Sequence, residues 1–164
     1  EAAARLRPRL IDLHSAEWTA PGEIRLRDDA RVYEIWEYGV ADRLGLIAAA
    51  RHALAKGLDV IEREVGARAA RLREGLDALP GVTVRDVGAR KSGIVTFTVD
   101  GLPANEVRDR LAREGVTVTV SGASSTLLDM TRRGLDEVVR ASPHYFVEPA
   151  QVDQAVEAVS RCAR

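Results

Sequence analysis

Residues 138–159 of the chain, VVRASPHYFVEPAQVDQAVEAV, decide the fold. At the start of this stretch, the apolar residues Val139 and Ala141 alternate with the polar residues Arg140 and Ser142. An alternation with a period of two is typical of a half-buried β-strand. The sequence therefore predicts a strand over residues 138–142, with Arg140 and Ser142 on its polar side.

Two prolines mark the end of this strand and the start of a helix. Pro143 interrupts the strand because it has no N–H to donate and its φ is fixed. Pro149 suits the first turn of a helix, where a missing N–H costs nothing. The apolar residues that follow recur at i, i+3, i+4 and i+7, as in a helix with one buried stripe: Val152, Ala155, Val156 and Val159. The stretch thus predicts a strand, a turn and an amphipathic helix.

Arg140 has two interpretations on the residues alone. A strand close to a turn gives a recognition residue rigid support, and a guanidinium suits bidentate capture of a carboxylate or phosphate. The commoner role of an arginine is to extend into solvent or to pair with a nearby Asp or Glu. Pattern and composition leave both interpretations open.

The run RASPHYF at residues 140–146, followed by an acidic helix containing VDQAV, resembles the C-terminal signature of the class V aminotransferases. These fold-type-I pyridoxal-phosphate enzymes include cysteine desulfurases, C–S lyases and isopenicillin N epimerase-like proteins. The arginine of this motif binds the substrate α-carboxylate in that family, so the resemblance implies this role for Arg140. We expect His144, four residues further on, to line the same site, with a purely structural role as the alternative.

Length and composition favour one soluble domain. The chain has 164 residues and a formal net charge of −1, which gives no electrostatic case for nucleic acid or an acidic membrane. No apolar run approaches the roughly 20 residues of a membrane span, and the start of the sequence lacks the apolar core of a signal peptide. The single cysteine, Cys162, has no partner for an intrachain disulfide. A cytoplasmic protein is expected.

The remaining pattern predicts an α+β fold, a small and mainly antiparallel sheet with helices packed on one face. The resemblance implies that this is the C-terminal domain of a fold-type-I enzyme. Residues 1–164 are expected to form a single domain, in which 1–40 connect and 41–164 form a helical and α+β small domain. Expected elements are helices at 41–56, 60–79 and 103–114, strands at 10–13, 82–87, 94–99 and 116–120, an extended stretch at 31–38, a helix end at 1–6, and loops at 14–29 and 121–133.

The polar run SGASST at residues 121–126 is, on its own, a solvated turn. Cysteine desulfurases often carry a loop ending in Thr-Gly-His-His-Cys upstream of the carboxylate-binding arginine. If Ser121 and Gly122 match the Thr-Gly of that loop, Ser125 takes the place of the sulfur-accepting cysteine. A serine cannot form a persulfide, so the chain does not resemble a cysteine desulfurase of that type. Ser125 becomes a substrate-site candidate instead.

Residues 31–39, RVYEIWEYG, resemble the family segment Arg-Phe-Glu-x-Gly-Thr, whose threonine reaches the cofactor phosphate of the partner subunit. Tyr33 and Glu34 match the Phe-Glu, and Trp36 and Glu37 stand in the places of Gly and Thr. Glu37 is therefore the candidate cofactor-binding residue. Its carboxylate would repel a phosphate, so that contact has to be made differently. The resemblance also implies a homodimer.

The lysine that binds pyridoxal 5′-phosphate in this family precedes the region that the chain matches. Lys56 lies in a predicted helix and Lys91 in a turn, and neither is in the motif of that lysine. No catalytic residue is therefore expected in this chain. The histidines form no ligand pair and there is one cysteine, so no metal site is expected either.

These observations imply the C-terminal, substrate-carboxylate-binding portion of a pyridoxal-phosphate enzyme that acts on an amino acid as a lyase, epimerase or aminotransferase. The absent large domain would bind most of the cofactor, so the chain would be a fragment of the enzyme or one half of a split enzyme. The alternative is a non-catalytic α+β module that binds a carboxylate ligand or a protein partner.

Overall fold

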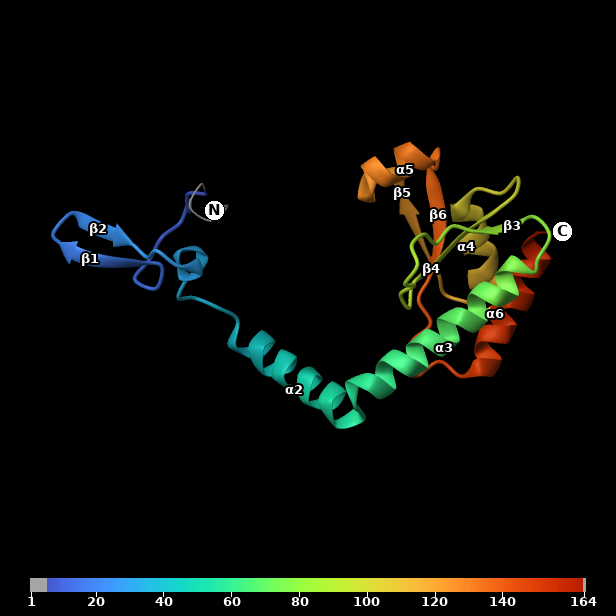
Figure 1. The fold of residues 1–164 in the computed structure, drawn as a ribbon, viewed down its shortest axis with the longest axis horizontal. Helices are drawn as coiled ribbons and strands as arrows, with labels where there is room; N and C mark the ends of the chain where they lie inside the picture. Colours follow the sequence, from blue (N-terminus) through green and yellow to red (C-terminus); the bar gives the residue numbers. More distant parts are fainter. Residues whose placement is uncertain (1–5, 164) are drawn as a thin grey trace. The chain divides into compact units, whose positions relative to one another are not determined.

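The computed structural model describes residues 6–163, and its ribbon is drawn in Figure 1. The chain divides into two compact units, residues 1–52 and 53–164, which are described one after the other. The predicted division near residue 40 stays a prediction, and the helix end predicted at 1–6 falls almost entirely outside the described residues.

The second unit is built on one antiparallel sheet of four strands, in the order β3-β4-β6-β5. Val139 lies at its centre, opposite Phe97 on one side and Val120 on the other. The strands are β3 (Val82–Val84), β4 (Val95–Val99), β5 (Thr119–Gly122) and β6 (Glu137–Ala141). The strands predicted at 82–87 and 94–99 pair directly with each other as β3 and β4, although β3 ends at Val84.

Three helices cover one face of this sheet, namely α3 (Leu58–Asp77), α4 (Ala104–Arg113) and α6 (Pro149–Cys162). Figure 1 shows α3 and α6 side by side. Their apolar stripes and the inward residues of the strands form one core: Ala69, Leu72, Leu76, Val95, Phe97, Val107, Leu111, Val139, Val152 and Val159 are all buried. The predicted α+β fold with helices on one face is confirmed.

The strand predicted at residues 116–120 is displaced, because β5 runs from Thr119 to Gly122. The register pairs Thr119 with Arg140. Continued backwards, it would place Val116 opposite Pro143, which has no N–H to donate. The two segments therefore diverge, and a cavity of about 600 Å³ opens between them and α6. Residues 116–120 do alternate, but residues 116–118 have no strand to pair with.

The loop predicted at residues 121–133 is wrong for most of its length. It contains the end of β5, the 3-10 turn η2 (Ala123–Ser125) and a seven-residue helix, α5 (Leu127–Arg133). Serine and threonine suggested a loop, but Met130 is buried and Asp129 pairs with Arg133 one turn later. These contacts stabilise a helix too short for its own propensity to sustain.

The first unit contains a hairpin where a loop was predicted at 14–29. Its strands are β1 (Ala16–Ala20) and β2 (Glu23–Leu26), joined through Gly22 at φ 81°. Charged residues in both strands hid the pairing, while residues 10–13 form no strand. The stretch at 31–38 was predicted as extended, but its first three residues belong to a 3-10 turn, η1 (Ala30–Tyr33).

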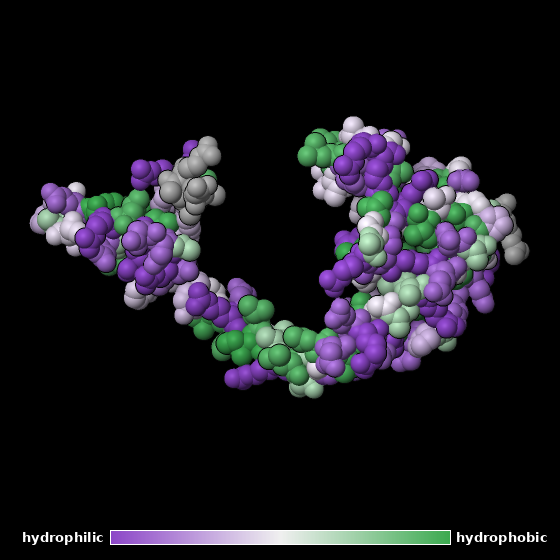
Figure 2. All heavy atoms as spheres, viewed as in Figure 1, coloured by the Kyte–Doolittle hydropathy of each residue, from purple (hydrophilic) through white to green (hydrophobic). Residues whose placement is uncertain are grey.

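The predicted helix at 41–56 is confirmed as α2 (Val40–Lys56), but none of its residues is buried. Its apolar side chains Leu44, Ile47 and Leu54 are all exposed. Figure 2 shows apolar side chains gathered along this helix. Within residues 6–163, no helix has the length and apolar character that crossing a membrane requires.

Candidate functional site

Arg140 projects from the face of the sheet opposite α3, α4 and α6, which is called the open face below. Its neighbour Val139 is fully buried in the core, and successive side chains of a strand point to opposite faces. The Arg140 side chain is exposed, and within residues 6–163 its guanidinium has no hydrogen bond or ion pair. An unpaired guanidinium on a central strand is well placed to bind an anion from outside the chain.

Threonine hydroxyls surround Arg140 on this open face. Thr96 on β4 and Thr119 on β5 lie directly opposite Arg140 in the register. The Thr119 Oγ1 donates to the carbonyl oxygen of Arg140 at 3.4 Å. One pleat along β4, Thr98 Oγ1 accepts from Arg85 Nε at 3.0 Å. The open face is thus polar around Arg140, while Val138, two residues earlier on the same face, is buried.

His144 and Ser125 lie in the same unit as Arg140, but the structure does not bring them into contact with it. His144 follows the Ala141 end of β6, where its exposed ring lies 4.5 Å from the Tyr145 ring and 4.9 Å from the Phe146 ring. Ser125 follows the opposite end, beyond the pair of Gly122 with Glu137.

The pair of Gly122 with Glu137 lies about 10 Å along the strand from Arg140, and Ser125 lies beyond it. Among the described residues, no hydrogen bond or ion pair joins Ser125 or His144 to Arg140. Their assignment to the substrate site stays a prediction.

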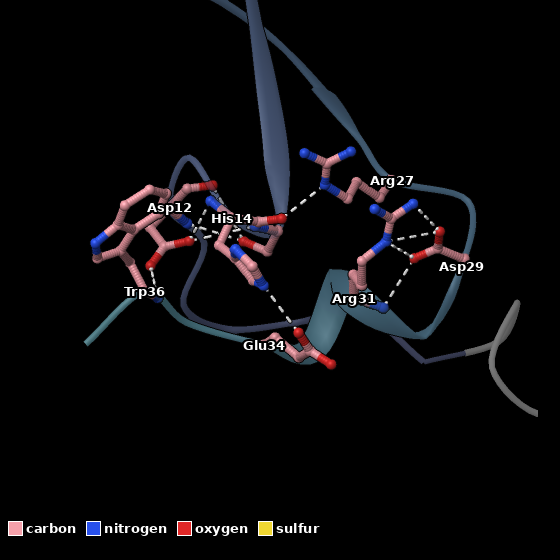
Figure 3. A network of polar contacts seen from close by, with 8 residues as sticks. Asp12, His14, Arg27, Asp29, Arg31, Glu34 and Trp36 are labelled. Atoms are coloured by element: carbon pink, nitrogen blue, oxygen red, sulfur yellow. Dashed lines mark hydrogen bonds and ion pairs between the residues drawn. The ribbon is translucent and has the colours of Figure 1, made fainter. Parts of the chain in front are cut away.

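Glu37 lies in the first unit, exposed, directly after a network of polar contacts drawn in Figure 3. The Trp36 N–H donates to Asp12 Oδ2 at 2.5 Å, and His14 Nε2 lies 2.9 Å from Glu34 Oε2. The backbone N–H of Trp36, followed by those of His14 and Ser15, lowers the pKa of Asp12. The chain before Glu37 is therefore held in place, while the Glu37 carboxylate has no hydrogen bond or ion pair within residues 6–163.

Sequence reasoning missed this network. His14 and Glu34 are 20 residues apart, and no periodic pattern links them. The Glu of the family segment was matched at Glu34, but its histidine partner was assigned to a loop. Only the hairpin between them, formed by β1 and β2, brings the two side chains together.

The described residues do not by themselves fit pyridoxal phosphate. Lys56 Nζ lies 5.0 Å from the centre of the Tyr145 ring, and Lys91 Nζ donates to the carbonyl oxygen of Asp86 at 3.0 Å. Neither ammonium group stands where it could bind an aldehyde beside a phosphate site, so no step of cofactor chemistry is assigned to this chain. Within the described range, no three His, Cys, Asp or Glu residues gather as metal ligands.

Comparison with known protein families matches residues 25–155 to the family described as aminotransferase class-V. The chain belongs to the class V aminotransferase family. This family depends on pyridoxal phosphate, and the match confirms the resemblance found in RASPHYF. Comparison with curated proteins gave no match.

Solved structures agree with this class V aminotransferase assignment. The chain is similar to a cysteine desulfurase from Thermococcus onnurineus NA1, with 26% identity and a TM-score of 0.83 over 95% of this chain and 39% of that one. It shares its fold with the Escherichia coli cysteine desulfurase CsdA, at 20% identity and a TM-score of 0.81 over 94% of this chain and 38% of that one.

The cystine C–S lyase C-DES also has this fold, at 20% identity and a TM-score of 0.71 over 93% of this chain and 38% of that one. The class V aminotransferase chain therefore spans less than two fifths of the length of these relatives.

Proposed function

We propose that this chain is the C-terminal, substrate-carboxylate-binding portion of a pyridoxal-phosphate enzyme that acts on an amino acid. The observation that carries the proposal is the unpaired guanidinium of Arg140 on the open face of the sheet. Arg140 stands in the motif position whose arginine binds the substrate α-carboxylate in this family. In the proposed enzyme, Arg140 holds that carboxylate and so fixes the orientation of the amino acid.

Geometry and charge support a carboxylate ligand. The two oxygens of a carboxylate match the fork of a guanidinium in a bidentate contact. Thr96 and Thr119 on the flanking strands keep the surroundings of the guanidinium polar, but their hydroxyl protons are engaged elsewhere, so the carboxylate contact is left to Arg140 itself. Pyridoxal phosphate would supply the electron sink for a carbanion at Cα, and the chain's own part is to bind and orient the substrate.

The exposed apolar surface supports a larger assembly. Residues 6–58 expose sixteen large apolar side chains, which is far more than isolated surface residues require. In the proposal, the remainder of the enzyme and a second subunit cover this surface, and Glu37 lies near the cofactor of the partner subunit. The enzyme is a cytoplasmic homodimer with lyase, epimerase or aminotransferase activity.

The experiment measures amino-acid binding by the intact protein with Arg140 replaced. The probes are L-alanine and ethylamine, which is alanine without its carboxylate. Loss of a charged hydrogen-bonding partner weakens binding about 10- to 100-fold, so Arg140→Ala should lose L-alanine affinity by this factor and keep its affinity for ethylamine. The L-alanine affinity of Arg140→Lys should lie between those of the unaltered protein and Arg140→Ala, since an ammonium cannot form the bidentate contact.

The matched control is Arg63→Ala, which removes an exposed arginine from α3. It should bind both probes as the unaltered protein does. Unchanged L-alanine affinity in Arg140→Ala would contradict the proposed role. Binding of L-alanine through Arg140 by a chain of this length alone, without cofactor, would favour the carboxylate-binding module instead.

A further inference from the structure

The pairing of β3 with β4 is irregular next to Arg140. The Arg85 N–H donates to the carbonyl oxygen of Thr96 at 2.7 Å, as in a regular antiparallel pair. The return bond is missing, because the Thr96 N–H donates instead to Asp86 Oδ1 at 2.8 Å. The carbonyl oxygen of Arg85 accepts from Arg133 Nη2 on α5. A carboxylate has thus replaced a backbone oxygen at this point of the sheet.

Asp86 also determines where the hydroxyl proton of Thr96 lies. The Thr96 Oγ1 donates to Asp86 Oδ1 at 2.6 Å, so the only proton of this hydroxyl is already in a hydrogen bond. What Thr96 Oγ1 can still offer to other neighbours is acceptor lone pairs. A threonine hydroxyl that has no carboxylate acceptor can rotate, so it can act as a donor or as an acceptor toward a neighbour.

Arg73 holds Asp86 from the other side. Its Nε donates to Asp86 Oδ2 at 2.6 Å, and the two side chains are only 15% and 10% exposed. Arg73 Nη2 donates further to the carbonyl oxygens of Ser92 and Ile94, at 2.7 Å each. Asp86 is therefore neutralised and fixed by a partner from α3, and its negative charge is not available to capture Arg140.

Thr96 is the cross-strand neighbour of Arg140 on the open face. Directly opposed residues have their Cβ atoms about 5 Å apart. A guanidinium has only donors, so a neighbouring oxygen that is locked as an acceptor complements it. Within residues 6–163 no hydrogen bond joins these two side chains. We propose that the Arg140 guanidinium donates to the Thr96 hydroxyl when it holds its carboxylate ligand, and that Asp86, by orienting this hydroxyl, positions the guanidinium. This inference rests on the proposed role of Arg140, and Thr96 and Asp86 are positioning residues within it.

The test compares isosteric variants of Thr96 in the intact protein, again with L-alanine and ethylamine as probes. Thr96→Val keeps the shape of the side chain and removes the acceptor, so L-alanine binding should weaken about three- to tenfold, the value of one hydrogen bond. Thr96→Ser restores the hydroxyl and should recover most of that loss. Ethylamine binding should not change in either variant.

Thr98→Val is the matched control, since Thr98 lies on the same strand and the same face, one pleat away. It should bind L-alanine as the unaltered protein does. The Nε–Hε NMR signal of Arg140 gives a readout that loss of stability alone would not move. This signal should shift in Thr96→Val and in Asp86→Ala, which removes the acceptor of the Thr96 hydroxyl proton. It should stay in place in Thr98→Val.

Equal L-alanine affinity in Thr96→Val and Thr98→Val would overturn the inference, and so would a Thr96→Ser variant that recovers nothing. Arg140→Ala distinguishes failure of the proposed role of Arg140 from failure of the positioning role of Thr96 and Asp86. If that variant binds L-alanine normally, the proposed function itself fails. If Arg140→Ala weakens binding and Thr96→Val does not, the proposed function stands and only the positioning role of Thr96 and Asp86 is lost.

Discussion

Asp29 is held by Arg31, two residues further along the chain. Its carboxylate accepts from Arg31 Nη2 at 2.5 Å and from the Arg31 backbone N–H at 2.9 Å (Figure 3). The side-chain hydrogen bonds of Arg31, and then its backbone N–H, lower the pKa of Asp29 to about 2. The same contacts cap the η1 turn at its first residue.

The low pKa of Asp29 predicts how the η1 turn responds to acid. A carboxyl group whose folded pKa is depressed stabilises the fold above its unfolded pKa, near 3.9, and loses this contribution as the pH falls through the folded value. The η1 turn should therefore become less ordered between about pH 4 and pH 2. The NMR signal of the Arg31 backbone amide measures this change. In Asp29→Asn this step should be absent, and an unchanged step would contradict the assignment.

Arg140 and Thr96 show what can be predicted for the site from the sequence. Arg140 was found because its strand alternates and its motif resembles a family signature. Thr96 and Asp86 carry no such signal, since their roles depend on the register of β4 against β6 and on an interruption of the β3 ladder. Side chains that act together across strands have no fixed spacing in the sequence.

The packing of α3 against α6 depends on a glycine at the contact. A Cβ at Gly75 would lie 2.6 Å from Val156 Cγ2, closer than two carbon atoms can approach, whereas a Cβ at Gly66 on the same helix would have no heavy atom within 4 Å. The two positions form a natural pair for testing the interface.

Gly75→Ala should destabilise the protein by about 1–3 kcal/mol, because overpacking forces α3 and α6 apart. Gly66→Ala should stabilise it by about 0.5–1 kcal/mol, since alanine is the better helix former. Urea unfolding of both variants measures the two free energies. Stabilisation of similar size in both would show that α3 and α6 do not pack as described.

The helices were predicted more accurately than the strands. The helix predicted at 103–114 is found as α4, with Val107 and Leu111 fully buried. A helix can be predicted from its own segment, because it makes its hydrogen bonds within that segment. For β5, the alternation was read correctly but the bounds were not, since the pairing stops before Pro143, two residues after the end of β6. A strand exists only where a partner can complete its ladder.

Across the whole chain, burial is concentrated in residues 53–164. The first unit has few buried apolar side chains, among them Ala16 and Val32, and α2 has none. A helix of 17 residues without packing is marginal in water. In the proposed enzyme, the remainder of the enzyme and the second subunit would stabilise this helix.

Hydrogen exchange should report this difference. In the chain on its own, backbone amides of α2 should exchange within seconds, while those of β4 and β6 stay protected for much longer. In the intact protein, α2 should become protected, because a partner surface then covers Leu44 and Ile47. Equal protection of α2 in both samples would show that the helix needs no such partner.

The sequence by itself determined the helices α3, α4 and α6, the antiparallel character of the sheet, the family, and Arg140 as the residue of interest. Each of these depends on a local period or a contiguous motif. Tertiary structure decided the bounds of β5, the helix α5, the contact of His14 with Glu34, and the link from Arg73 through Asp86 to Thr96. These features join residues far apart in the chain, and only the folded backbone brings their polar groups within hydrogen-bonding distance.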